Sequence, residues 1–390
     1  MKGNTIKKIG FKILAVFGVL LLQCTSPEKA AQPIDFAKLS WPIFRGDANL
    51  SGVAAGDLAA SLTLLWSFQT GDAIASSPVV GFGRVFIGST DGKLYALDAA
   101  TGDSVWAFDS GDDIEAPPML FDSTVYIGNL SGDFFALNAR SGERQWSFTT
   151  DGEIYGSANH AAAPNGIDEW IVVGSYDFKT YCFDAKTGAK QWEYESDNFI
   201  NGAPATDGKV ILFGGCDERL HIVGVADGRK IGEVVAGSYI AGSAAFVDGH
   251  AYLGHYGEEL LCIDVAKQKT VWRYDDDGDA GSFFSTPAVN KNYVVIGSRD
   301  SKVHCVDRKN GEKVWSFKTR DDVDGSPVIC GDKVVVGSND GRLYILDVRS
   351  GDMLWSYEIG ADVAGSPAVT NGFVFIGADD GRLYAFGENR

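Results

Sequence analysis

The stretch Ala96-Leu97-Asp98-Ala99-Ala100-Thr101-Gly102-Asp103-Ser104-Val105-Trp106 decides the fold, because its spacing of Asp, Gly and Trp returns along the chain. The clearest later copies end at Trp146, Trp192, Trp272, Trp315 and Trp355, and a lone Trp66 precedes the first. One worn copy places Ile231 where the others have Trp. Members of this series follow one another at intervals of about 40 residues, which is the repeat length of four-stranded propeller blades.

Each repeat contains four short runs rich in β-branched and aromatic residues. In the first unit these runs are residues 77–80, 84–88, 93–97 and 104–108, with Gly, Asp or Ser between them. Such runs predict strands joined by hairpins, which we call A to D from the channel outward. The units, and hence the predicted blades of an all-β, eight-bladed β-propeller, begin at Pro78, Pro118, Ala158, Pro204, Ala244, Pro287, Pro327 and Pro367.

The two ends of the repeat region complement each other. Residues 62–68 form a lone strand D, whereas residues 365–386 supply strands A to C with no D after them. Pairing the two would complete the last blade and close the ring, which removes the open sheet edges. The preceding segment Trp41–Asp47 is expected to pack on the propeller body.

The repeated motif has a physical purpose. Asp98 can accept hydrogen bonds from the backbone N–H groups that follow it, and Gly102 can adopt a positive φ, so the turn between strands C and D is tight. Trp106 then stands at a fixed place on the outer strand and is predicted to bury its ring between blades. The same docking role is predicted for Trp146, Trp192, Trp272, Trp315 and Trp355.

This motif resembles the repeat of the pyrroloquinoline-quinone (PQQ)-type β-propellers, and the resemblance covers residues 62–387. It implies the fold but not an activity, because the repeat serves enzymes and scaffolds alike. Quinone-dependent dehydrogenases of this superfamily hold their cofactor beside a vicinal disulfide and a calcium ion, and this sequence has no adjacent cysteines. Asp275, Asp277 and Asp279 are a poor match to a calcium loop, which needs Gly at its sixth and Glu at its twelfth position. We therefore expect no catalysis, cofactor or metal.

The first 23 residues have the pattern of a signal peptide, with a basic region at 1–12 and an apolar region at 13–22 that is too short to span a membrane. The sequence Leu21-Leu22-Gln23-Cys24 resembles a bacterial lipobox, although Gln23 stands where Gly, Ala or Ser is usual. Cys24 is predicted to be lipidated; the alternative is a plain cleaved signal with an incidental cysteine. Residues 24–40 are predicted to be a tether and residues 41–390 the propeller. Thr25 after the cysteine resembles an outer-membrane address.

The formal net charge of −18 excludes nucleic acid as an expected partner, because a chain this acidic repels it. The D–A connections and B–C turns share one face, which gathers acids such as Asp321 and Asp322. The C–D turns on the other face carry bases such as Arg308 and Lys309. This difference either serves solubility or orients a partner.

A candidate ligand site lies where strands A begin at the channel. Glu115, Tyr155, Asn201 and Asp324 occupy equivalent positions in their blades, and His160 lies on strand A of blade three. These five side chains are predicted to converge on one channel mouth, where a propeller would bind a ligand. The alternative is a hydrated channel lining.

With the lipobox, the architecture resembles the BamB family of outer-membrane assembly factors, which are lipid-anchored propellers. The resemblance implies a monomeric, non-catalytic scaffold on the periplasmic side of the outer membrane that binds an envelope protein partner, such as the barrel-assembly machinery. The alternatives are a PQQ-like module for a small ligand or another envelope partner, and a quinoprotein dehydrogenase.

Overall fold

The computed structural model describes residues 1–3 and 35–388. The compact unit begins at Asp35, so the folded body starts before the boundary at 41 that the sequence predicted. Leu39 is buried, and the Phe36 and Phe373 rings lie 5.2 Å apart. The end of the predicted tether 24–40 therefore packs against the propeller. Cys24, and the predicted signal peptide 1–23 beyond its first three residues, lie outside the described part.

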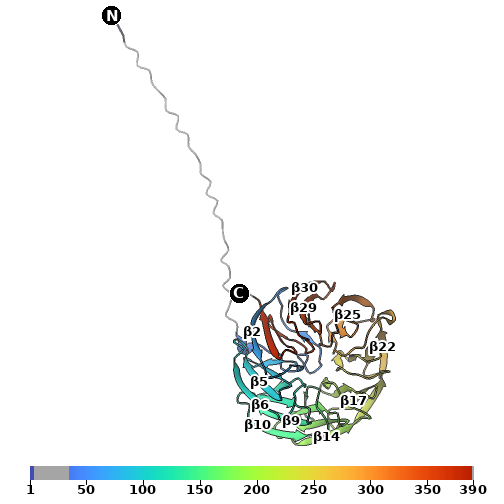
Figure 1. Ribbon diagram of the computed structural model, residues 1–390. Coiled ribbons are helices and arrows are strands. Elements are labelled where there is room, and N and C mark those ends of the chain that lie inside the picture. The colour runs from blue at the N-terminus through green and yellow to red at the C-terminus, as the bar shows by residue number, and fades with distance from the viewer. Residues whose placement is uncertain (4–34, 389–390) are drawn as a thin grey trace. The chain divides into compact units, whose positions relative to one another are not determined.

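Eight sheets form the ring of blades that the repeats predicted (Figure 1). Blade one consists of β3 (Val79–Gly81), β4 (Arg84–Gly88), β5 (Lys93–Asp98) and β6 (Ser104–Asp109). Blade two consists of β7 (Met119–Phe121), β8 (Thr124–Gly128), β9 (Asp133–Asn138) and β10 (Arg144–Thr149). Blade three consists of β11 (Asn159–Ala162), β12 (Glu169–Gly174), β13 (Lys179–Asp184) and β14 (Lys190–Glu195). Blade four consists of β15 (Ala205–Thr206), β16 (Val210–Gly214), β17 (Arg219–Gly224) and β18 (Lys230–Val235).

The second half of the ring repeats this order. Blade five consists of β19 (Ala245–Val247), β20 (His250–Gly254), β21 (Leu260–Asp264) and β22 (Lys269–Tyr274). Blade six consists of β23 (Ala288–Val289), β24 (Tyr293–Ser298), β25 (Lys302–Asp307) and β26 (Lys313–Lys318). Blade seven consists of β27 (Val328–Cys330), β28 (Lys333–Ser338), β29 (Arg342–Asp347) and β30 (Met353–Glu358), with β1 (Val53–Ala54) added in parallel to β27. Blade eight consists of β31 (Ala368–Thr370), β32 (Phe373–Gly377), β33 (Arg382–Gly387) and β2 (Thr63–Gln69).

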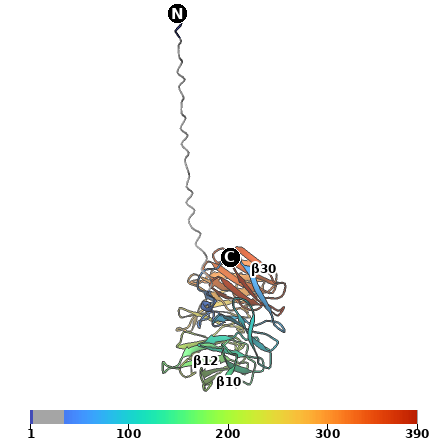
Figure 2. The ribbon, with the colours of Figure 1, turned by 90° about the vertical axis from the view of Figure 1, so that its left-hand side faces the viewer.

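The predicted closure of the ring is confirmed. Strand β2 pairs antiparallel with β33, with Leu64 opposite Phe386 and Trp66 opposite Ala385. Figure 2 shows the same ring turned by 90° about the vertical axis. Helical structure in the described residues is limited to the short turns η1 (Phe36–Lys38) and η2 (Asp276–Gly278), and none of their helices has the length and hydropathy to cross a membrane. The first and last parts of the repeat region therefore complete a single blade.

The apolar core is divided among the interfaces between neighbouring blades. Phe86 and Leu94 of blade one, for example, are buried in one cluster with Val125 and Leu137 of blade two. Both faces of each inner strand are covered in this way, because each blade lies between two others. This explains why these strands read as continuous apolar runs rather than as an alternation.

The outer Trp residues dock on the next blade. Trp106 Nε1 donates a hydrogen bond to the carbonyl of Ala139 at 3.3 Å, and its ring lies so close to Gly142 that a Cβ there would approach it within 2.9 Å. Gly142 also has a φ of 76°, so two constraints select glycine. The same arrangement joins Trp66 to Gly102, Trp146 to Gly188, Trp192 to Gly228, Trp272 to Gly311 and Trp315 to Gly351.

Blade four departs from the sequence interpretation. The sequence interpretation placed Ile231 at the Trp position. In the structure Gly232 occupies that position, because it lies opposite Ile222 as Trp106 lies opposite Ala96. Ile231 is the bulged residue beside Gly232. At the Gly position of the next blade stands Gln268, with a φ of 53°. The side chain of Gln268 fills the space against Gly232 where other blades hold an indole ring.

The segment before the repeats does more than pack on the body, because it runs around the inside of the channel. The second strand-A residue of six blades donates its backbone N–H to a carbonyl of residues 41–52: Val80 to Trp41, Leu120 to Pro42, Thr206 to Ala48, Phe246 to Asn49, Val289 to Ser51 and Ile329 to Gly52. In blade three the contact is made by Asn159 Nδ2, which donates to the Ala48 carbonyl at 2.8 Å. Residues 41–54 thus form an inner ring that occupies the channel.

Arg45 fixes this inner ring. Its guanidinium is buried and donates to the carbonyls of Ser326, at 3.0 Å, and Pro327. Burial lowers the pKa of Arg45 to about 9, and the nearby Asp47 acts in the opposite direction, so the group stays charged at neutral pH. Asp47 accepts a hydrogen bond from the backbone N–H of Ser51 at 3.0 Å and closes the local turn. The Arg-Gly-Asp sequence therefore has a structural role.

Candidate functional site

The D–A connections and B–C turns meet on one face, here called the D–A face. Gly71 in a D–A connection donates its N–H to Asp91 Oδ2 in a B–C turn at 2.8 Å. Arg320 and Asp340 repeat the contact at 3.0 Å in a later blade. The opposite face, formed by A–B and C–D turns, is called the A–B face.

A cavity of about 190 Å³ opens at the centre of the D–A face. Four of the five residues predicted to converge there line it: Glu115, Tyr155, Asn201 and Asp324. Phe44 of the inner ring also contributes to the lining. The channel mouth is therefore a shallow cavity whose wall includes part of the N-terminal segment.

Serine and threonine hydroxyls link the blades around this cavity. The residue before the strand-A proline position donates its backbone N–H to the hydroxyl of its counterpart in the next blade over 2.8–3.0 Å: Ala203 to Ser243, Ser243 to Thr286, Thr286 to Ser326, Ser326 to Ser366 and Ser366 to Ser77. Pro117 interrupts the series after blade one, since its side chain has no hydroxyl. These bonds satisfy buried amides and keep the rim rigid.

Two of the predicted site residues are held by neighbours. The Asp324 carboxylate accepts two hydrogen bonds from Arg299, at 2.8 and 3.0 Å, and a third from Asn339 at 3.2 Å. Asn201 Nδ2 donates to the carbonyl of Ile240 at 2.9 Å. Both side chains thus contribute to the structure of the rim.

Glu115 differs, because its carboxylate has no hydrogen-bond or ion-pair partner among the described residues 35–388. Burial raises the pKa of Glu115, and the negative charges of Asp113 and Asp379 raise it further. Burial also raises the pKa of Tyr155, with a smaller contribution from Glu115. The cavity therefore holds an acid whose charge is not compensated by any of the residues that the structure describes.

His160 does not reach the channel mouth, contrary to the sequence prediction. Its ring packs against Phe121 at a centroid distance of 4.3 Å, with the two planes tilted by 35°, and its Nδ1 lies 3.6 Å from Glu169 Oε2. The reason is its position on β11, opposite Ile171, which turns the side chain between blades two and three. Burial lowers the pKa of His160, and Glu169 opposes that effect.

Aromatic side chains that the sequence interpretation missed extend from both sides of the cavity. From Tyr155 they run through Tyr176, Phe199 and Phe178, with successive ring centroids 4.6, 4.8 and 5.1 Å apart. Phe199 is 40% and Phe178 is 37% exposed. We call these four residues the first aromatic row.

A second aromatic row consists of Phe284, Tyr256 and Tyr239. Centroid distances are 4.6 Å for Phe284 to Tyr256 and 6.4 Å for Tyr256 to Tyr239, and the Arg299 guanidinium covers Phe284 at 3.3 Å. Tyr239 and Tyr256 are 48% and 45% exposed. The sequence contained a sign of these rows. Phe199 and Tyr239 stand at loop positions where other blades carry an acid, namely Asp113, Glu153, Asp322 and Asp362.

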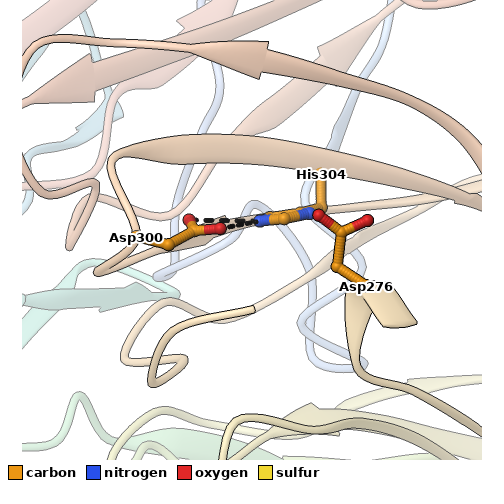
Figure 3. Close-up of side chains that lie close together, drawn as sticks. All are labelled: Asp276, Asp300 and His304. Atoms are coloured by element: carbon orange, nitrogen blue, oxygen red, sulfur yellow. Dashed lines mark hydrogen bonds and ion pairs between the residues drawn. The ribbon is translucent and has the colours of Figure 1, made fainter. Parts of the chain in front are cut away.

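A Tyr–His–Asp arrangement near the D–A face has the residue types of a proton relay. The Tyr274 hydroxyl lies 2.9 Å from His304 Nδ1. On the other side of the ring, His304 Nε2 lies 3.1 Å from Asp300 Oδ2 (Figure 3). His304 is fully buried, and another blade repeats the arrangement with Tyr194, His221 and Asp217. In other blades Tyr occupies the His position and donates directly to the Asp, as Tyr95 does to Asp91. The arrangement is therefore a repeated element of the blade.

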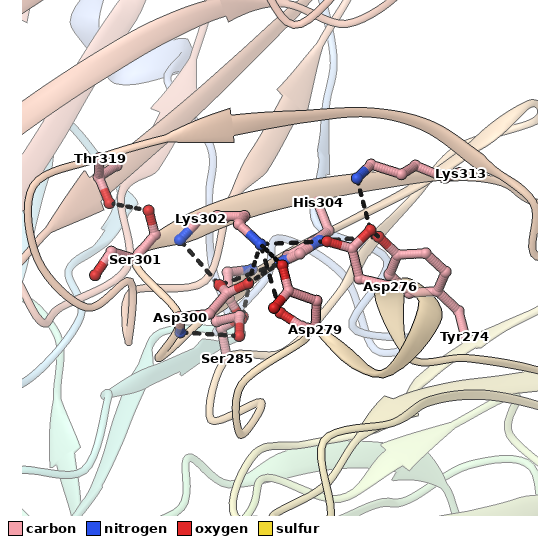
Figure 4. A network of polar contacts seen from close by, with 12 residues as sticks. Tyr274, Asp276, Asp279, Ser285, Asp300, Ser301, Lys302, His304, Lys313 and Thr319 are labelled. Atoms are coloured by element: carbon pink, nitrogen blue, oxygen red, sulfur yellow. Dashed lines mark hydrogen bonds and ion pairs between the residues drawn. The ribbon is translucent and has the colours of Figure 1, made fainter.

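Asp276 joins this arrangement, and the ligand atoms of Asp276, Asp300 and His304 lie within 4.8 Å of one another. Lysine ammonium groups already neutralise the carboxylates (Figure 4). Lys302 Nζ lies 3.0 Å from Asp300 and 3.3 Å from Asp276, and Lys313 Nζ lies 2.6 Å from Asp276. A metal ion would have to displace these cations, so the geometry favours an ion-pair network.

The cysteines do not match a quinone site. Four of the thiols are buried: Cys182, Cys262, Cys305 and Cys330. Cys216 lies near the channel mouth beside Asn201, and neither residue next to it in the sequence is a cysteine. The vicinal disulfide associated with the PQQ cofactor in related dehydrogenases has no counterpart. The residues of the channel mouth thus do not fit that cofactor as those enzymes hold it.

Comparison with known proteins identifies the family. A family profile described as "Outer membrane protein assembly factor BamB" matches residues 52–166 and 216–390. The outer membrane protein assembly factor BamB of Nitrosomonas eutropha is 27% identical over 116 residues, which are 30% of this chain and 27% of that relative's length.

Among solved structures, BamB from Moraxella catarrhalis has a TM-score of 0.72 at 21% identity, covering 84% of this chain and all of the other. Quinohemoprotein alcohol dehydrogenase from Comamonas testosteroni has a TM-score of 0.75 at 14% identity, covering 90% of this chain and 81% of the other. Both likenesses concern the fold. The family match, spread over both halves of the propeller, shows that this chain belongs to the family of the outer membrane protein assembly factor BamB.

Proposed function

We propose that this protein is a non-catalytic scaffold of outer-membrane protein assembly, which binds an envelope protein partner through its D–A face. One observation carries the proposal: two exposed aromatic rows flank an acidic cavity on a rigid, closed propeller. Large aromatic side chains supply contact area at low entropic cost, and such anchors dominate protein interfaces. The family membership supports the same role.

The chemistry of the face suggests what the partner presents. The unpaired Glu115 and its neighbours Asp113 and Asp379 favour a cationic group at the cavity. The exposed rings of Phe199 and Tyr256 favour apolar or cationic side chains beside it. We infer a partner segment that combines Lys or Arg with apolar residues.

A pull-down tests this proposal. The protein carrying Phe199→Ala and Tyr256→Ala should recover less of its partner from detergent-solubilised envelopes than the unchanged protein. Phe82→Ala serves as the matched control, since Phe82 is a 48% exposed aromatic in an A–B turn on the other face. Equal recovery by all three proteins would refute docking through the aromatic rows.

We further propose that Cys24 is acylated and holds the protein at the periplasmic side of the outer membrane. The supporting observation is the lipobox-like sequence ending at Cys24 after an apolar run. Cys24→Ser should abolish palmitate labelling and leave the protein in the soluble fraction or unprocessed. Labelling and fractionation identical to the unchanged protein would contradict the proposal.

The uncompensated Glu115 favours a second candidate, a binding module for a small cation in the same cavity. Calorimetric titration with alkyl amines distinguishes the candidates, since the scaffold needs no such ligand. The scaffold also predicts no dye reduction with PQQ, calcium and an alcohol. Alcohol-dependent reduction would establish a dehydrogenase instead.

A further inference from the structure

A second pocket lies on the opposite, A–B face, between blades five and six, with a volume of about 430 Å³. Asp248 and His250 come from the A–B turn of blade five and the strand after it. Lys291 comes from the A–B turn of blade six, and Arg308 and Lys309 come from its C–D turn. Four of these five side chains are basic, in a protein whose net charge is −18.

The basic charge of this pocket is not neutralised from within. Asp248 is the one acid in the lining, and its carboxylate is engaged by the Arg308 guanidinium at 2.8 Å. Arg308 is further held by the Tyr252 hydroxyl at 2.9 Å and by the carbonyls of Val247 and Asn290. Arg308 is therefore a fixed part of the wall.

The remaining bases are free to receive a ligand. Lys291 and Lys309 are exposed and form no ion pair with the described residues. His250 Nδ1 lies 3.0 Å from the Asp248 carbonyl oxygen, which orients the imidazole with its N–H toward that oxygen. Two lysine ammonium groups and one imidazole thus border the pocket without an ion-pair partner among the described residues.

The equivalent position between blades two and three shows that this charge is specific. A pocket of about 510 Å³ lies there and contains Tyr126, the counterpart of Tyr252. Its lining carries the acids Asp122 and Glu169 with only one base, Lys186. The same architecture thus produces a mostly acidic pocket at one interface and a basic pocket at the other.

The basic pocket also has an apolar wall. Val271 is 51% exposed beside it, and the Trp272 ring and Tyr252 contribute to the lining. The volume falls within the range of about 300–1,000 Å³ that is typical of small-molecule sites. A ligand that fits combines an anionic head for the lysines with a less polar body for this wall.

We propose that this pocket binds a phosphate-bearing anion, either a soluble phosphate ester or the headgroup of an anionic phospholipid. Lysine is a common ligand of phosphate oxygens, because its ammonium group acts as a point charge. The A–B face is also where the compact unit begins, since Ala37 lies against Gly83 in the A–B turn of blade one. The proposal is independent of the scaffold role of the D–A face.

Calorimetric titration of the full chain tests the site. The probes are inorganic phosphate and sn-glycerol 3-phosphate. The pocket variant is Lys291→Glu with Lys309→Glu, and the control variant, with the same charge change at exposed positions of the same face, is Lys209→Glu with Arg349→Glu.

We expect saturable binding of sn-glycerol 3-phosphate that weakens at least tenfold in the pocket variant and less than twofold in the control. Flotation with phosphatidylglycerol and phosphatidylcholine vesicles separates the two sources. If the pocket variant, but not the control variant, loses binding to phosphatidylglycerol vesicles, the ligand is a lipid headgroup. If the protein binds the soluble probe and not the vesicles, the ligand is a soluble phosphate ester. Absence of saturable binding to every probe, or equal losses in both variants, would overturn the site.

Discussion

The docking of Trp on Gly joins blades through a pair of residues far apart in the sequence. Trp315, for example, needs Gly351 both for the space its ring occupies and for the donor contact to the Val348 carbonyl at 2.9 Å. At the interface between blades four and five both partners have changed, to Gly232 and Gln268. The two substitutions compensate each other, since the Gln side chain takes the volume of the missing indole.

This compensation predicts a coupled mutational effect. Gly232→Trp alone should destabilise because the indole would clash with Gln268. The double variant with Gln268→Gly should be more stable than the sum of the single changes by about 1–3 kcal/mol. Denaturant unfolding of the four proteins measures the coupling energy, and strictly additive changes would contradict the docking account.

Glu115 predicts a pH dependence. Because burial and the neighbouring acids raise its pKa in the folded state, the folded protein retains this proton over a pH range in which the unfolded chain has released it. The resulting stability is present at low pH and is lost as the pH rises through the folded-state pKa. Glu115→Gln should therefore stabilise the protein at pH 7 and lose this advantage at pH 4. Melting temperatures at both pH values measure it, and an equal shift at both would argue against a charge effect.

At the scale of elements, two N-terminal pieces serve different parts of the ring. Strand β2 completes blade eight, whereas the inner ring of residues 41–54 bonds to the innermost strands of the blades. The first protects an outer edge and the second fills the channel. The two contributions can be separated by deletion.

In a protein lacking residues 35–54 the ring should remain closed, but the protein should lose stability. Six backbone N–H donors lose their acceptors, and the carbonyls of Ser326 and Pro327 lose the Arg45 guanidinium. A protein lacking residues 35–69 should also aggregate, because β33 and Trp355 would be left at an open blade. Denaturant unfolding and light scattering give the two readouts. Equal aggregation of both proteins would show that closure does not depend on β2.

Sequence reasoning predicted the blades well, because the repeated Asp, Gly and Trp fix turns and outer strands locally. Strand β2 was predictable from the missing last strand. The inner ring was not, since its bonds are made by backbone carbonyls, whose partners no side-chain pattern reveals. The shift of one residue at Ile231 arose because, in six of the eight blades, a bulge carries an exposed apolar residue beside the docking position, as Val105 does in blade one.

The candidate site, like the fold, was predicted only in part from the sequence. Equivalent positions before the strand-A proline identified Glu115 and Asp324 at the cavity, because equivalent residues of a ring converge. His160 was misplaced because both faces of strand A pack against neighbouring blades, so a residue within the strand points into a blade interface, and only the loop position before the strand faces the cavity. The aromatic rows were missed because each ring belongs to a different loop, and only the folded ring brings Tyr176 beside Phe199.

At the scale of the molecule, the two faces differ in what they offer. The D–A face combines uncompensated acids with exposed rings, and the A–B face carries the basic pocket and the start of the compact unit. Charges at the rim of an interface change association rates more than the strength of the final complex. The D–A face is thus suited to steer a basic partner toward the aromatic rows.

Charge reversal on the D–A face tests this steering. Asp321→Lys with Asp362→Lys should slow association with the partner recovered in the pull-down and flatten its dependence on salt, while dissociation changes little. Both residues are exposed, and neither belongs to the Arg299–Asp324 pair. Asp103→Lys with Asp352→Lys makes the same charge change on the A–B face. Surface plasmon resonance at several salt concentrations gives the rates, and equal slowing by both variants would rule out steering by one face.

The inner ring also determines when this protein can fold. Residues 41–54 leave the ribosome before every strand to which they bond, and Arg45 reaches Ser326, 281 positions later. Strand β2 likewise waits for β33, the last strand made. Contacts of this span make folding slow. A chain whose synthesis is not yet finished therefore cannot complete its native structure, and the ring is sealed only after β33 has been made.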